Sequence, residues 1–528
     1  TTSTMLMITT SSTIAILSAL FLLRVLVGFQ THSGQDNFHG KLDAYGGDYE
    51  AQRHWMELTL HLPMGDWYWY ELEYWGLDYP PLTAYISWMC GFFSNLLVGP
   101  ESVAFESSRG YEDPTHKAYM RATVLVLDAL IYVSIVWVAT KGNKKVHDAQ
   151  SMWTLILALA QPALILMDHG HFQYNSVSLG FALWGLYFMT KQNFTNCIVG
   201  SIFFCLALNF KQMTLYYAPA VFAYLLGRCF ADKSTKVVQR FGALGVTVIA
   251  TFVLLWWPFI YYAPSINSNS DTQVTPSERL LHVLHRMFPF QRGLFEGKVS
   301  NLWCALSTKP ISIRQRLPES TQPIVALGMT LILILPACYK LFVVGQRQSI
   351  GASPSSQRND WKLLLWGSAS TGLAFFLASF QVHEKSILMA LAPISLLTWE
   401  DPTFCHWFSI VATWTLWPLI RVDRLEVATV CIMTIFGTLV WLFGASNKII
   451  PPSCFDKLTI TKAIVPLSSL SMLSLHLLEV FVTPPASLPD LFPVLWSIVG
   501  CGMFCVAWLV TCWHLYNSNE VPSKQKTK

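Results

Sequence analysis

Acidic and aromatic side chains are concentrated between Gly46 and Pro81 of a chain that is otherwise apolar. Asp48 stands where a helical pattern begins, and the backbone dipole at that end of a helix favours an ionised carboxylate. Asp78 is followed by Tyr79-Pro80-Pro81, and prolines stiffen this stretch in an extended geometry. A carboxylate held in a defined place can take the proton from an attacking hydroxyl group. Asp48 and Asp78 are therefore candidate catalytic carboxylates, although a helix cap and a turn residue are the simpler interpretations.

The residues after Asp48 follow the spacing of an amphipathic helix. One face carries polar residues at intervals of three and four, namely Glu50, Arg53, His54, Glu57 and His61. Another face is apolar and contains a tryptophan, which is typical of a helix lying in the membrane interface. The aromatic residues that follow could stack on sugar rings, but an interfacial anchor is the simpler interpretation for most of them. The candidates for contacts with an acceptor substrate are Glu50, Arg53, Trp75 and Tyr79.

The composition identifies a membrane protein. The chain has 528 residues, of which 53% are hydrophobic and 12% are charged, whereas soluble domains carry about 25% charged residues. The net charge of +4 arises from short basic loops that set the orientation of a membrane protein, and we expect no nucleic-acid partner. Most of the 12 cysteines lie inside apolar runs, and none is spaced with histidines as zinc ligands are. We expect neither a metal site nor a cofactor.

Long apolar runs predict about fourteen transmembrane helices in a single integral membrane domain, residues 1–528. The runs are 13–29, 119–139, 151–167, 176–190, 196–212, 213–228, 238–262, 323–344, 362–380, 386–399, 404–420, 426–444, 463–482 and 490–514. Residues 82–98 are apolar as well, and we expect them to lie in the membrane interface. Arg24 and Asp128 each lie inside an apolar run, which predicts a buried ion pair between the first two spans.

The distribution of Lys and Arg orients the chain. With fourteen spans, the basic loops and the C-terminal tail fall on one side together with the N-terminus, and the positive-inside rule makes this side cytosolic. These basic segments are 141–145, 228–236, 340–358 and the tail 524–528. The loop 345–361 is accordingly expected in the cytosol. The loops 30–118 and 259–322 are expected on the opposite side.

The same opposite side collects cations close to the candidate carboxylates. These cations are His171, Lys211, Arg286, Arg292, His383 and Lys385, and Glu384 is an acidic neighbour of the last two. Ionisable residues beside apolar helices indicate a functional site. A phosphate leaves as an anion at neutral pH without a general acid, so a site for a lipid-linked sugar phosphate needs one base and several cationic donors. We expect His383, and more weakly Lys211 and Arg286, to contact such a phosphate.

Several longer motifs resemble those of one enzyme family. They are GDYEAQRHWME, YWGLDYPPLTAY, SRGYE, DHGHFQYNSV, FKQM, HRMFPFQRGLFE and FQVHEKSIL, between Gly47 and Leu388. Together they resemble the eukaryotic dolichyl-phosphate-glucose glucosyltransferases of the endoplasmic reticulum. The resemblance implies the GT-C fold, a multi-pass protein of that membrane, and glucose transfer to a lipid-linked high-mannose oligosaccharide in the lumen. In such enzymes an acid of the first lumenal loop is the base, and that position matches Asp48.

Two sister enzymes of this family share the DYPP and HEK motifs. Gly76–Ala84, GLDYPPLTA, and Phe380–Lys385, FQVHEK, resemble the enzyme that adds the first glucose. This implies inverting transfer from dolichyl-phosphate-glucose, in alpha-1,3 linkage, to Man9GlcNAc2 on dolichyl pyrophosphate during protein N-glycosylation. The sister enzyme that adds the second glucose is one alternative. A lipid-sugar flippase or transporter is another, although the two similar halves with broken helices expected of a transporter are not visible.

Overall fold

The computed structural model describes residues 10–35, 47–70, 72–141, 149–231, 236–265, 274–288, 294, 299–347, 354–446 and 459–517. Helices make up the regular structure of these ranges, and no strand occurs in them. The chain is thus an all-helical protein, as its composition predicts.

The first part of the chain contains α1 (Thr10–Gly28), α2 (Asp48–His61), η1 (Met64–Asp66), α3 (Pro81–Leu97), η2 (Pro100–Val103), α4 (Pro114–Leu127), η3 (Asp128–Val133), α5 (Ser134–Lys141), α6 (Ala149–Leu159), α7 (Pro162–Ile165), η4 (Leu166–Phe172), α8 (Asn175–Met189), α9 (Phe194–Phe210), η5 (Gln212–Tyr217), α10 (Ala218–Cys229) and α11 (Val237–Tyr261). The second part contains α12 (Pro276–Met287), α13 (Leu302–Leu306), α14 (Ile313–Arg316), η7 (Glu319–Thr321), α15 (Gln322–Arg347), α16 (Pro354–Ala378), η8 (Glu384–Ile387), α17 (Leu388–Ser395), α18 (Pro402–Trp414), α19 (Trp417–Val422), α20 (Glu426–Ser446), α22 (Thr459–Phe481) and α23 (Leu491–Asn517). Of the short elements, η3 and η4 are π-helical.

Helical segments occupy all fourteen apolar runs identified in the sequence. Among the described residues, seven helices are long and apolar enough to cross a membrane: Pro114–Thr140, Gln150–Phe172, Val237–Tyr261, Glu319–Arg347, Glu426–Gly444, Ala463–Phe481 and Leu491–Asn517. Other runs form shorter helices, such as α8 with 15 residues and α9 with 17. The chain is therefore a polytopic membrane protein, and the number of fourteen crossings stays a prediction.

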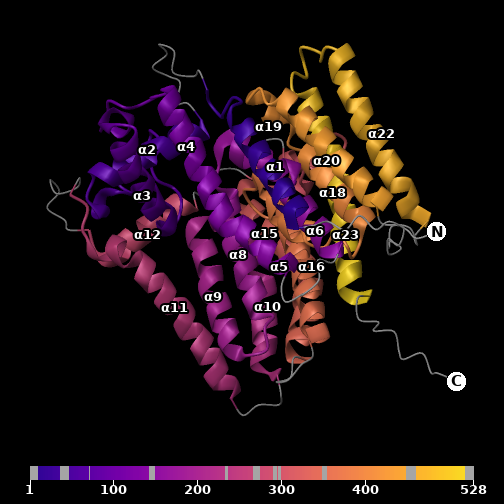
Figure 1. Ribbon diagram of the computed structural model, residues 1–528, viewed down its shortest axis with the longest axis horizontal. Coiled ribbons are helices and arrows are strands. Elements are labelled where there is room, and N and C mark those ends of the chain that lie inside the picture. The colour runs from indigo at the N-terminus through magenta and orange to yellow at the C-terminus, as the bar shows by residue number, and fades with distance from the viewer. Residues whose placement is uncertain are drawn as a thin grey trace.

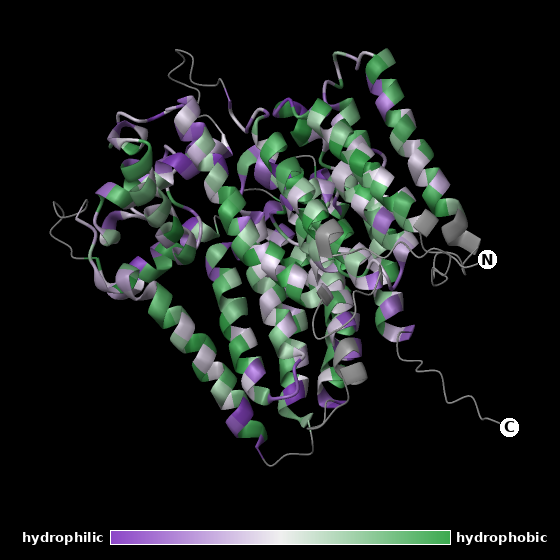
Figure 2. Ribbon diagram, in the orientation of Figure 1, coloured by the Kyte–Doolittle hydropathy of each residue, from purple (hydrophilic) through white to green (hydrophobic). Residues whose placement is uncertain are grey.

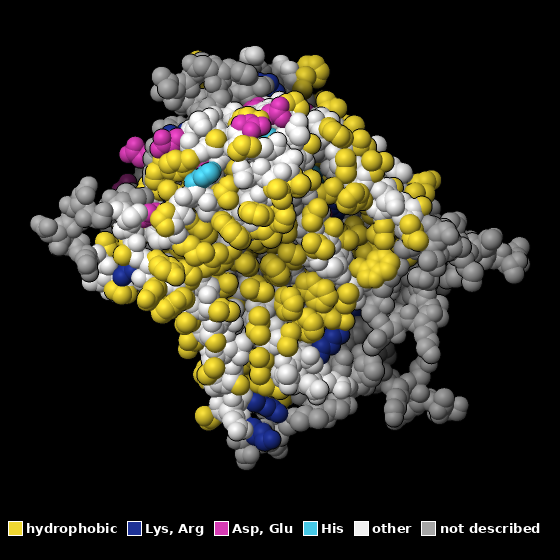
Figure 3. All heavy atoms as spheres, turned by 60° about the vertical axis from the view of Figure 1, so that its left-hand side comes forward, with side chains coloured by type: hydrophobic (Ala, Val, Ile, Leu, Met, Phe, Trp, Pro, Cys, Tyr) yellow, Lys and Arg dark blue, Asp and Glu magenta, His cyan; other side chains and the backbone are white. Residues whose placement is uncertain are grey.

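The helices form a bundle that carries a smaller helical layer at one end (Figure 1). This layer contains α2, α3 and α12, whereas the end of α10 and the start of α11 lie at the opposite end. Hydrophobic residues run along most of the bundle helices (Figure 2). Figure 3 shows a broad hydrophobic belt, with Asp and Glu side chains gathered at the end of the small layer and Lys and Arg side chains present at the opposite end. This distribution agrees with a membrane-embedded middle and two polar ends.

Aromatic packing fixes the small layer to the bundle. Side chains of the first loop form a common core with α11 and α12, and its buried members include Trp55, Trp67, Tyr68, Leu77, Trp256, Phe259 and Met287. On the other face of α3, Trp88, Phe92, Phe93, Leu96 and Leu97 are exposed, as expected if residues 82–98 border lipid. The polar residues of the first loop are thereby held at a fixed position relative to the membrane helices.

The polar stripe of α2 differs from the expectation of an interfacial helix, because Glu50, Arg53, His54 and Glu57 are buried and only His61, at the end of the helix, is exposed. The fully buried Arg53 donates hydrogen bonds to Glu50 at 2.6 Å and to Glu57 at 2.8 Å. Its other terminal nitrogen donates to Ser108 Oγ at 2.5 Å, and the Tyr74 hydroxyl donates to Glu50 at 2.9 Å. Buried charges are tolerated when they are paired and hydrogen-bonded in this way. The buried part of the stripe therefore joins parts of the first loop and does not face water.

The predicted ion pair between Arg24 and Asp128 is confirmed. Arg24 Nε lies 2.8 Å from Asp128 Oδ2, and both side chains are buried. Arg24 also donates to the carbonyl oxygen of Leu159 at 2.9 Å, and His169 Nε2 lies 3.3 Å from the same carboxylate oxygen. This cluster joins α1, η3 and η4 inside the bundle.

Candidate active site

Asp48 lies at the centre of a cluster of three donors from two distant parts of the chain. Its Oδ2 atom accepts from Lys385 Nζ at 2.5 Å, from Gln173 Nε2 at 2.5 Å and from His171 Nε2 at 2.6 Å. The side chain is 24% exposed. No described residue bonds its second oxygen, Oδ1. One oxygen of Asp48 is thus fixed by the protein, while the other has no hydrogen-bond donor among the described residues.

The first turn of α2 brings Asp48 into this position. Gly47 precedes it, and a Cβ atom at Gly47 would lie 2.4 Å from the carbonyl carbon of Ser33. Only glycine allows this close approach of two backbone segments. The Asp48 amide donates to Ser33 Oγ at 3.3 Å, and the Ser33 amide donates to the carbonyl oxygen of His171 at 3.0 Å. The helix start is thereby attached to the segment that carries His171.

The π-helical element η4 presents His171 and Gln173 to the site. π-Helical turns are rare and are frequently found at functional sites. At the end of η4 the backbone of Phe172 has φ +83°, a left-handed conformation that a bulky residue adopts only when its surroundings impose it. Arg121 stabilises this turn by donating to the carbonyl oxygens of His169 at 2.5 Å and Gly170 at 2.9 Å.

Asp168, at the other side of η4, secures the start of α8. Its carboxylate accepts from the amide of Asn175 at 3.0 Å, from Asn175 Nδ2 at 2.7 Å and from the amide of Ser176 at 2.6 Å. These bonds satisfy backbone donors that the first turn of a helix leaves unpaired. Asn175 is held with its amide oxygen toward Lys211.

Lys211 is the second cation of the site. Its ammonium group donates to Gln173 Oε1 at 2.7 Å and to Asn175 Oδ1 at 2.6 Å, and lies 5.2 Å from the centre of the Tyr79 ring. Burial, together with the positive charge of Lys385, lowers the pKa of Lys211 to about 7. Because both bonded partners are neutral amides, this cation is suited to bind an anion.

Asp48 is ionised at neutral pH for a physical reason that the geometry supplies. Burial alone would raise the pKa of Asp48, but the Lys385 ammonium and the His171 ring outweigh burial and hold that pKa well below its usual range. Opposite charges within hydrogen-bonding distance stabilise the carboxylate in this way. The carboxylate is therefore ready to accept a proton.

The remaining residues predicted from the sequence lie at varied distances from this centre. Asp78 is half-buried, and its negative charge partly opposes the lowering of the pKa of Lys211. The Tyr79 hydroxyl donates to Gln173 at 3.5 Å, which brings it next to the site. Trp75 has φ +46°, and its carbonyl oxygen accepts from the Trp55 indole at 2.8 Å.

The cations expected to hold a phosphate lie in different environments. His383 is exposed and caps η8, the element that carries Lys385, while Glu384 begins that element. Arg286 donates to the carbonyl oxygen of Gly76 at 2.9 Å, and Arg292 lies outside the described residues. Glu50 and Arg53, proposed for acceptor contacts, are engaged with each other inside the first loop. In the HEK motif it is the lysine that meets Asp48.

The structure adds Asp423, which the sequence did not single out. Its Oδ2 atom lies 2.5 Å from His171 Nδ1, although the two residues are 252 positions apart. An aspartate at the end of an apolar run has no distinguishing signal. Within the described part of the chain, no three His, Cys, Asp or Glu side chains are grouped as metal ligands would be.

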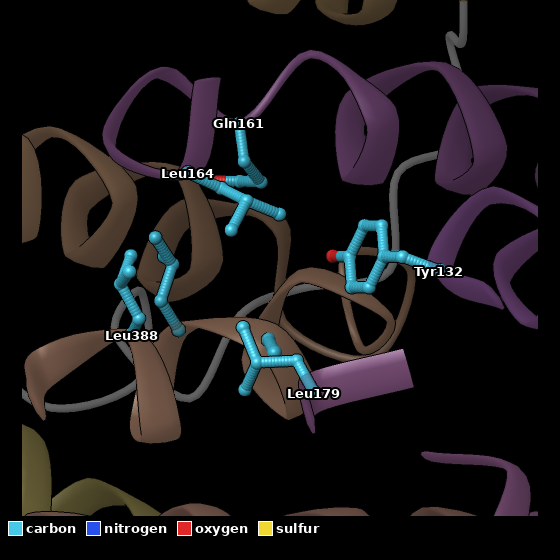
Figure 4. A pocket seen from close by; sticks show the side chains of 7 residues that line it. Tyr132, Gln161, Leu164, Leu179 and Leu388 are labelled. Carbon is cyan, nitrogen blue, oxygen red and sulfur yellow. The ribbon is translucent and has the colours of Figure 1, made fainter. Parts of the chain in front are cut away.

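A small gap in the bundle is distinct from this site. It is lined by Tyr132, Gln161, Leu164, Leu179, Leu388, Leu391 and Ala392 and is too narrow to hold a ligand. Figure 4 shows leucine side chains and the Tyr132 ring pointing into it. Its lining contains no charged group, so it is not suited to a sugar phosphate.

Comparison with known proteins agrees with the motifs. Residues 20–510 match the model of the ALG6, ALG8 glycosyltransferase family. A mouse (Mus musculus) protein named dolichyl pyrophosphate Man9GlcNAc2 alpha-1,3-glucosyltransferase is 40% identical over 480 residues, covering 87% of this chain and 88% of the mouse protein. Proteins of the same name from Gallus gallus and Saccharomyces cerevisiae are 39% and 33% identical and cover 93% and 95% of this chain, and 94% and 91% of their own lengths. The chain belongs to the ALG6, ALG8 glycosyltransferase family.

Proposed function

We propose that this protein transfers the first glucose from dolichyl-phosphate-glucose, in alpha-1,3 linkage, to Man9GlcNAc2 on dolichyl pyrophosphate for protein N-glycosylation. The observation that carries the chemistry is the Asp48 carboxylate, held at one oxygen by three donors and open at the other. The names of its relatives support the acceptor and the linkage. The sister reaction, which adds the second glucose, receives no support from those names.

In the proposed reaction Asp48 is the general base. The mannose hydroxyl attacks C1 of glucose from the side opposite the phosphate, and its proton passes to Asp48 Oδ1. The new bond joins the mannose hydroxyl oxygen to C1 while the bond between C1 and the phosphate oxygen breaks, so the configuration at C1 inverts. A positioned base accelerates such a step by about 10²- to 10⁴-fold. Dolichyl phosphate leaves with the electron pair and needs no proton.

The departing phosphate needs cations close to the base. Lys385 touches Asp48, and Lys211 is bonded only to neutral amide oxygens among the described residues. Preorganised cations that meet a developing negative charge stabilise the transition state without reorganisation. We assign both lysines to the donor phosphate, with His383 and Arg286 as outer candidates. Asp78 and Tyr79 are left for the acceptor.

The proposed setting is the endoplasmic reticulum membrane, with the site facing the lumen and the C-terminus in the cytosol. The one-sided basic loops of the sequence support this orientation. His383 is exposed, so a cysteine placed there reports its side directly. In sealed microsomes an impermeant thiol reagent should label it only after permeabilisation. Labelling of intact microsomes would contradict the orientation.

The activity is tested with the purified full-length protein in detergent. The assay supplies dolichyl-phosphate-glucose with either Man9GlcNAc2 or its monoglucosylated form on dolichyl pyrophosphate, and scores the glucosylated product. We expect product from the unglucosylated acceptor alone. Product from the monoglucosylated acceptor alone would indicate the sister reaction, and transport without glucosylation would indicate a flippase.

A further inference from the structure

The His171 ring is held between two carboxylates. Its Nε2 atom lies 2.6 Å from Asp48 Oδ2 and its Nδ1 atom lies 2.5 Å from Asp423 Oδ2. The side chains of His171 and Asp423 are 3% and 2% exposed, so water does not compete for these contacts. An ionised carboxylate only accepts hydrogen bonds, so the two contacts fit a protonated imidazolium that donates to both. Asp48 thus faces a positive ring that a second, hidden acid supports.

The turn that carries Asp423 fixes its position. Asp423 follows the last residue of α19, the Arg424 amide donates to the carbonyl oxygen of Arg421 at 3.1 Å, and the Leu425 amide donates to that of Ile420 at 3.0 Å. These two bonds form a Schellman motif, in which a left-handed residue ends the helix. Arg424 takes this conformation with φ +57°, where glycine is more common. The backbone strain of this left-handed conformation therefore occurs in the turn that places Asp423 next to His171.

The backbone around Asp423 does not stabilise its negative charge. A carboxylate at the C-terminal end of a helix gains no favourable interaction from the backbone dipole. A buried charge requires a partner, and among the described residues the Asp423 side chain is hydrogen-bonded to His171. The Arg121 guanidinium adds an electrostatic attraction at longer range. The pairing of the two side chains is therefore the reason that an acid can occupy this place.

Other charged and titratable groups around the ring leave the pairing intact. Those on the neighbouring elements are Asp48 on α2, Lys385 on η8, Arg121 on α4, and Asp168 and His169 on η4 itself. Lys385 Nζ lies 3.0 Å from His171 Nε2 and shares Asp48 Oδ2 with it. Arg121 is directed to backbone carbonyl oxygens, while His169 faces Asp128. The Asp423 carboxylate thus compensates the positive charge of the His171 ring on the side of Nδ1.

We propose that Asp423 is a positioning residue for glucosyl transfer, which acts through the His171 ring to orient and retain the catalytic carboxylate of Asp48. The inference rests on the proposed function, in which Asp48 is the base. It assigns a role in the site to α19, an element near the end of the sequence that carries none of the family motifs quoted above. Asp423 itself touches no substrate, since its side chain lies behind the ring.

A double-mutant cycle tests this role in the purified full-length protein. Removing a hydrogen bond to a charged group should lower kcat of Asp423→Asn by about 10- to 100-fold, with little change in donor KM. In the His171→Gln background the same substitution should cause no further loss, because residues that act only through each other are not additive. Asp401→Asn is the matched control, since Asp401 is another buried acid that pairs with a histidine, His514, at 2.9 Å. It should leave kcat unchanged.

The pH profile separates positioning from a structural role. Without the charge of Asp423 the ring binds its proton less tightly, so kcat of Asp423→Asn should fall between pH 6 and 8, where wild type stays level. Wild-type kcat at every pH, or an equal loss with and without His171, would overturn the proposal. Asp423→Ser offers the same test if the asparagine variant does not fold. Wild-type protein is assayed in parallel, and its failure to form product would refute the proposed function rather than this role.

Discussion

Two aspartate–histidine clusters meet at the same short element, η4, and they serve different purposes. His169 joins Asp128 and Arg24 in a cluster where every side chain is at most 5% exposed. His171, two residues later, joins Asp423 and Asp48, and the Asp48 side chain is 24% exposed. The first cluster is closed on itself inside the bundle. The second includes the partly exposed carboxylate that we propose as the base.

The difference teaches that residue types alone do not distinguish a structural ion cluster from one that we propose to be catalytic. Both clusters contain carboxylates, a histidine and a basic side chain at similar distances. In the Asp128 cluster the charges stabilise one another and hold three helical elements together. In the Asp48 cluster the donors named above all bond one carboxylate oxygen, and the side chain is partly exposed. Accessibility therefore separates the two roles, and each can be tested by removing its aspartate.

The largest effect is expected for Asp48→Asn. Loss of the base should lower kcat by about 10²- to 10⁴-fold, while donor affinity persists because the cations are unchanged. Asparagine retains the size and much of the helix-capping ability of aspartate, so the thermal midpoint should stay close to wild type. Turnover is measured with radiolabelled donor, and stability by thermal unfolding in detergent. A lower midpoint with normal turnover would assign Asp48 to a structural role.

The opposite pattern is expected for Asp128→Asn. Arg24 would stay buried without a carboxylate, and breaking a buried ion pair in this way costs about 3–5 kcal/mol. The yield and the thermal midpoint should fall. The protein that remains folded should keep its kcat, since Asp128 does not touch the site. A variant with normal stability but reduced kcat would show that the two clusters are coupled.

The next effect concerns the acid side of the pH profile. A base works only when ionised, and Lys385 helps hold the pKa of Asp48 well below its usual range. Lys385→Met should raise that pKa and move the acid limb of kcat upward by about 1–3 pH units. Lys362→Met is the control, since Lys362 pairs with Glu400, away from the site. If the acid limb of the kcat profile does not move in Lys385→Met, the ionisation of Asp48 does not determine that limb.

A smaller effect is expected on donor affinity. The pKa of Lys211 is about 7 in the free protein, so above pH 7 the amine must take up a proton to bind phosphate. Affinity should therefore fall by up to about tenfold per pH unit above pH 7. The phosphodiester of the donor keeps one negative charge throughout this range and does not contribute. Lys211→Arg stays charged and should lose the dependence, whereas a slope retained in that variant would exclude Lys211.

The fold follows closely from the sequence because apolar length and polarity are local signals. A helix occupies every apolar run that the sequence contains, and the Arg24–Asp128 pair is found where two isolated charges within such runs predict it. Asp48 is also predictable, because it combines an acid with a helix start. These properties depend on residues that are neighbours in the chain.

The partners of Asp48 are harder to predict because they depend on how distant helices pack. The motif HEK contains three ionisable residues, and the sequence gives no reason to prefer Lys385 over His383. Asp423 reaches the site only because α19 ends beside η4, 252 positions from His171. The burial of Arg53 has the same origin, since its partner Ser108 lies 55 positions away. Such contacts leave no period or spacing in the sequence.

The most direct test of Asp48 as the base compares it with its rival in the first loop. Asp48→Asn and Asp78→Asn are each loaded with radiolabelled dolichyl-phosphate-glucose, and bound donor is measured before acceptor is added. The single-turnover rate of glucose transfer is then followed in both. We predict that both bind donor and that only Asp48→Asn loses transfer by about 10²-fold or more. Normal transfer by Asp48→Asn, with a folded but inactive Asp78→Asn, would reverse the two roles.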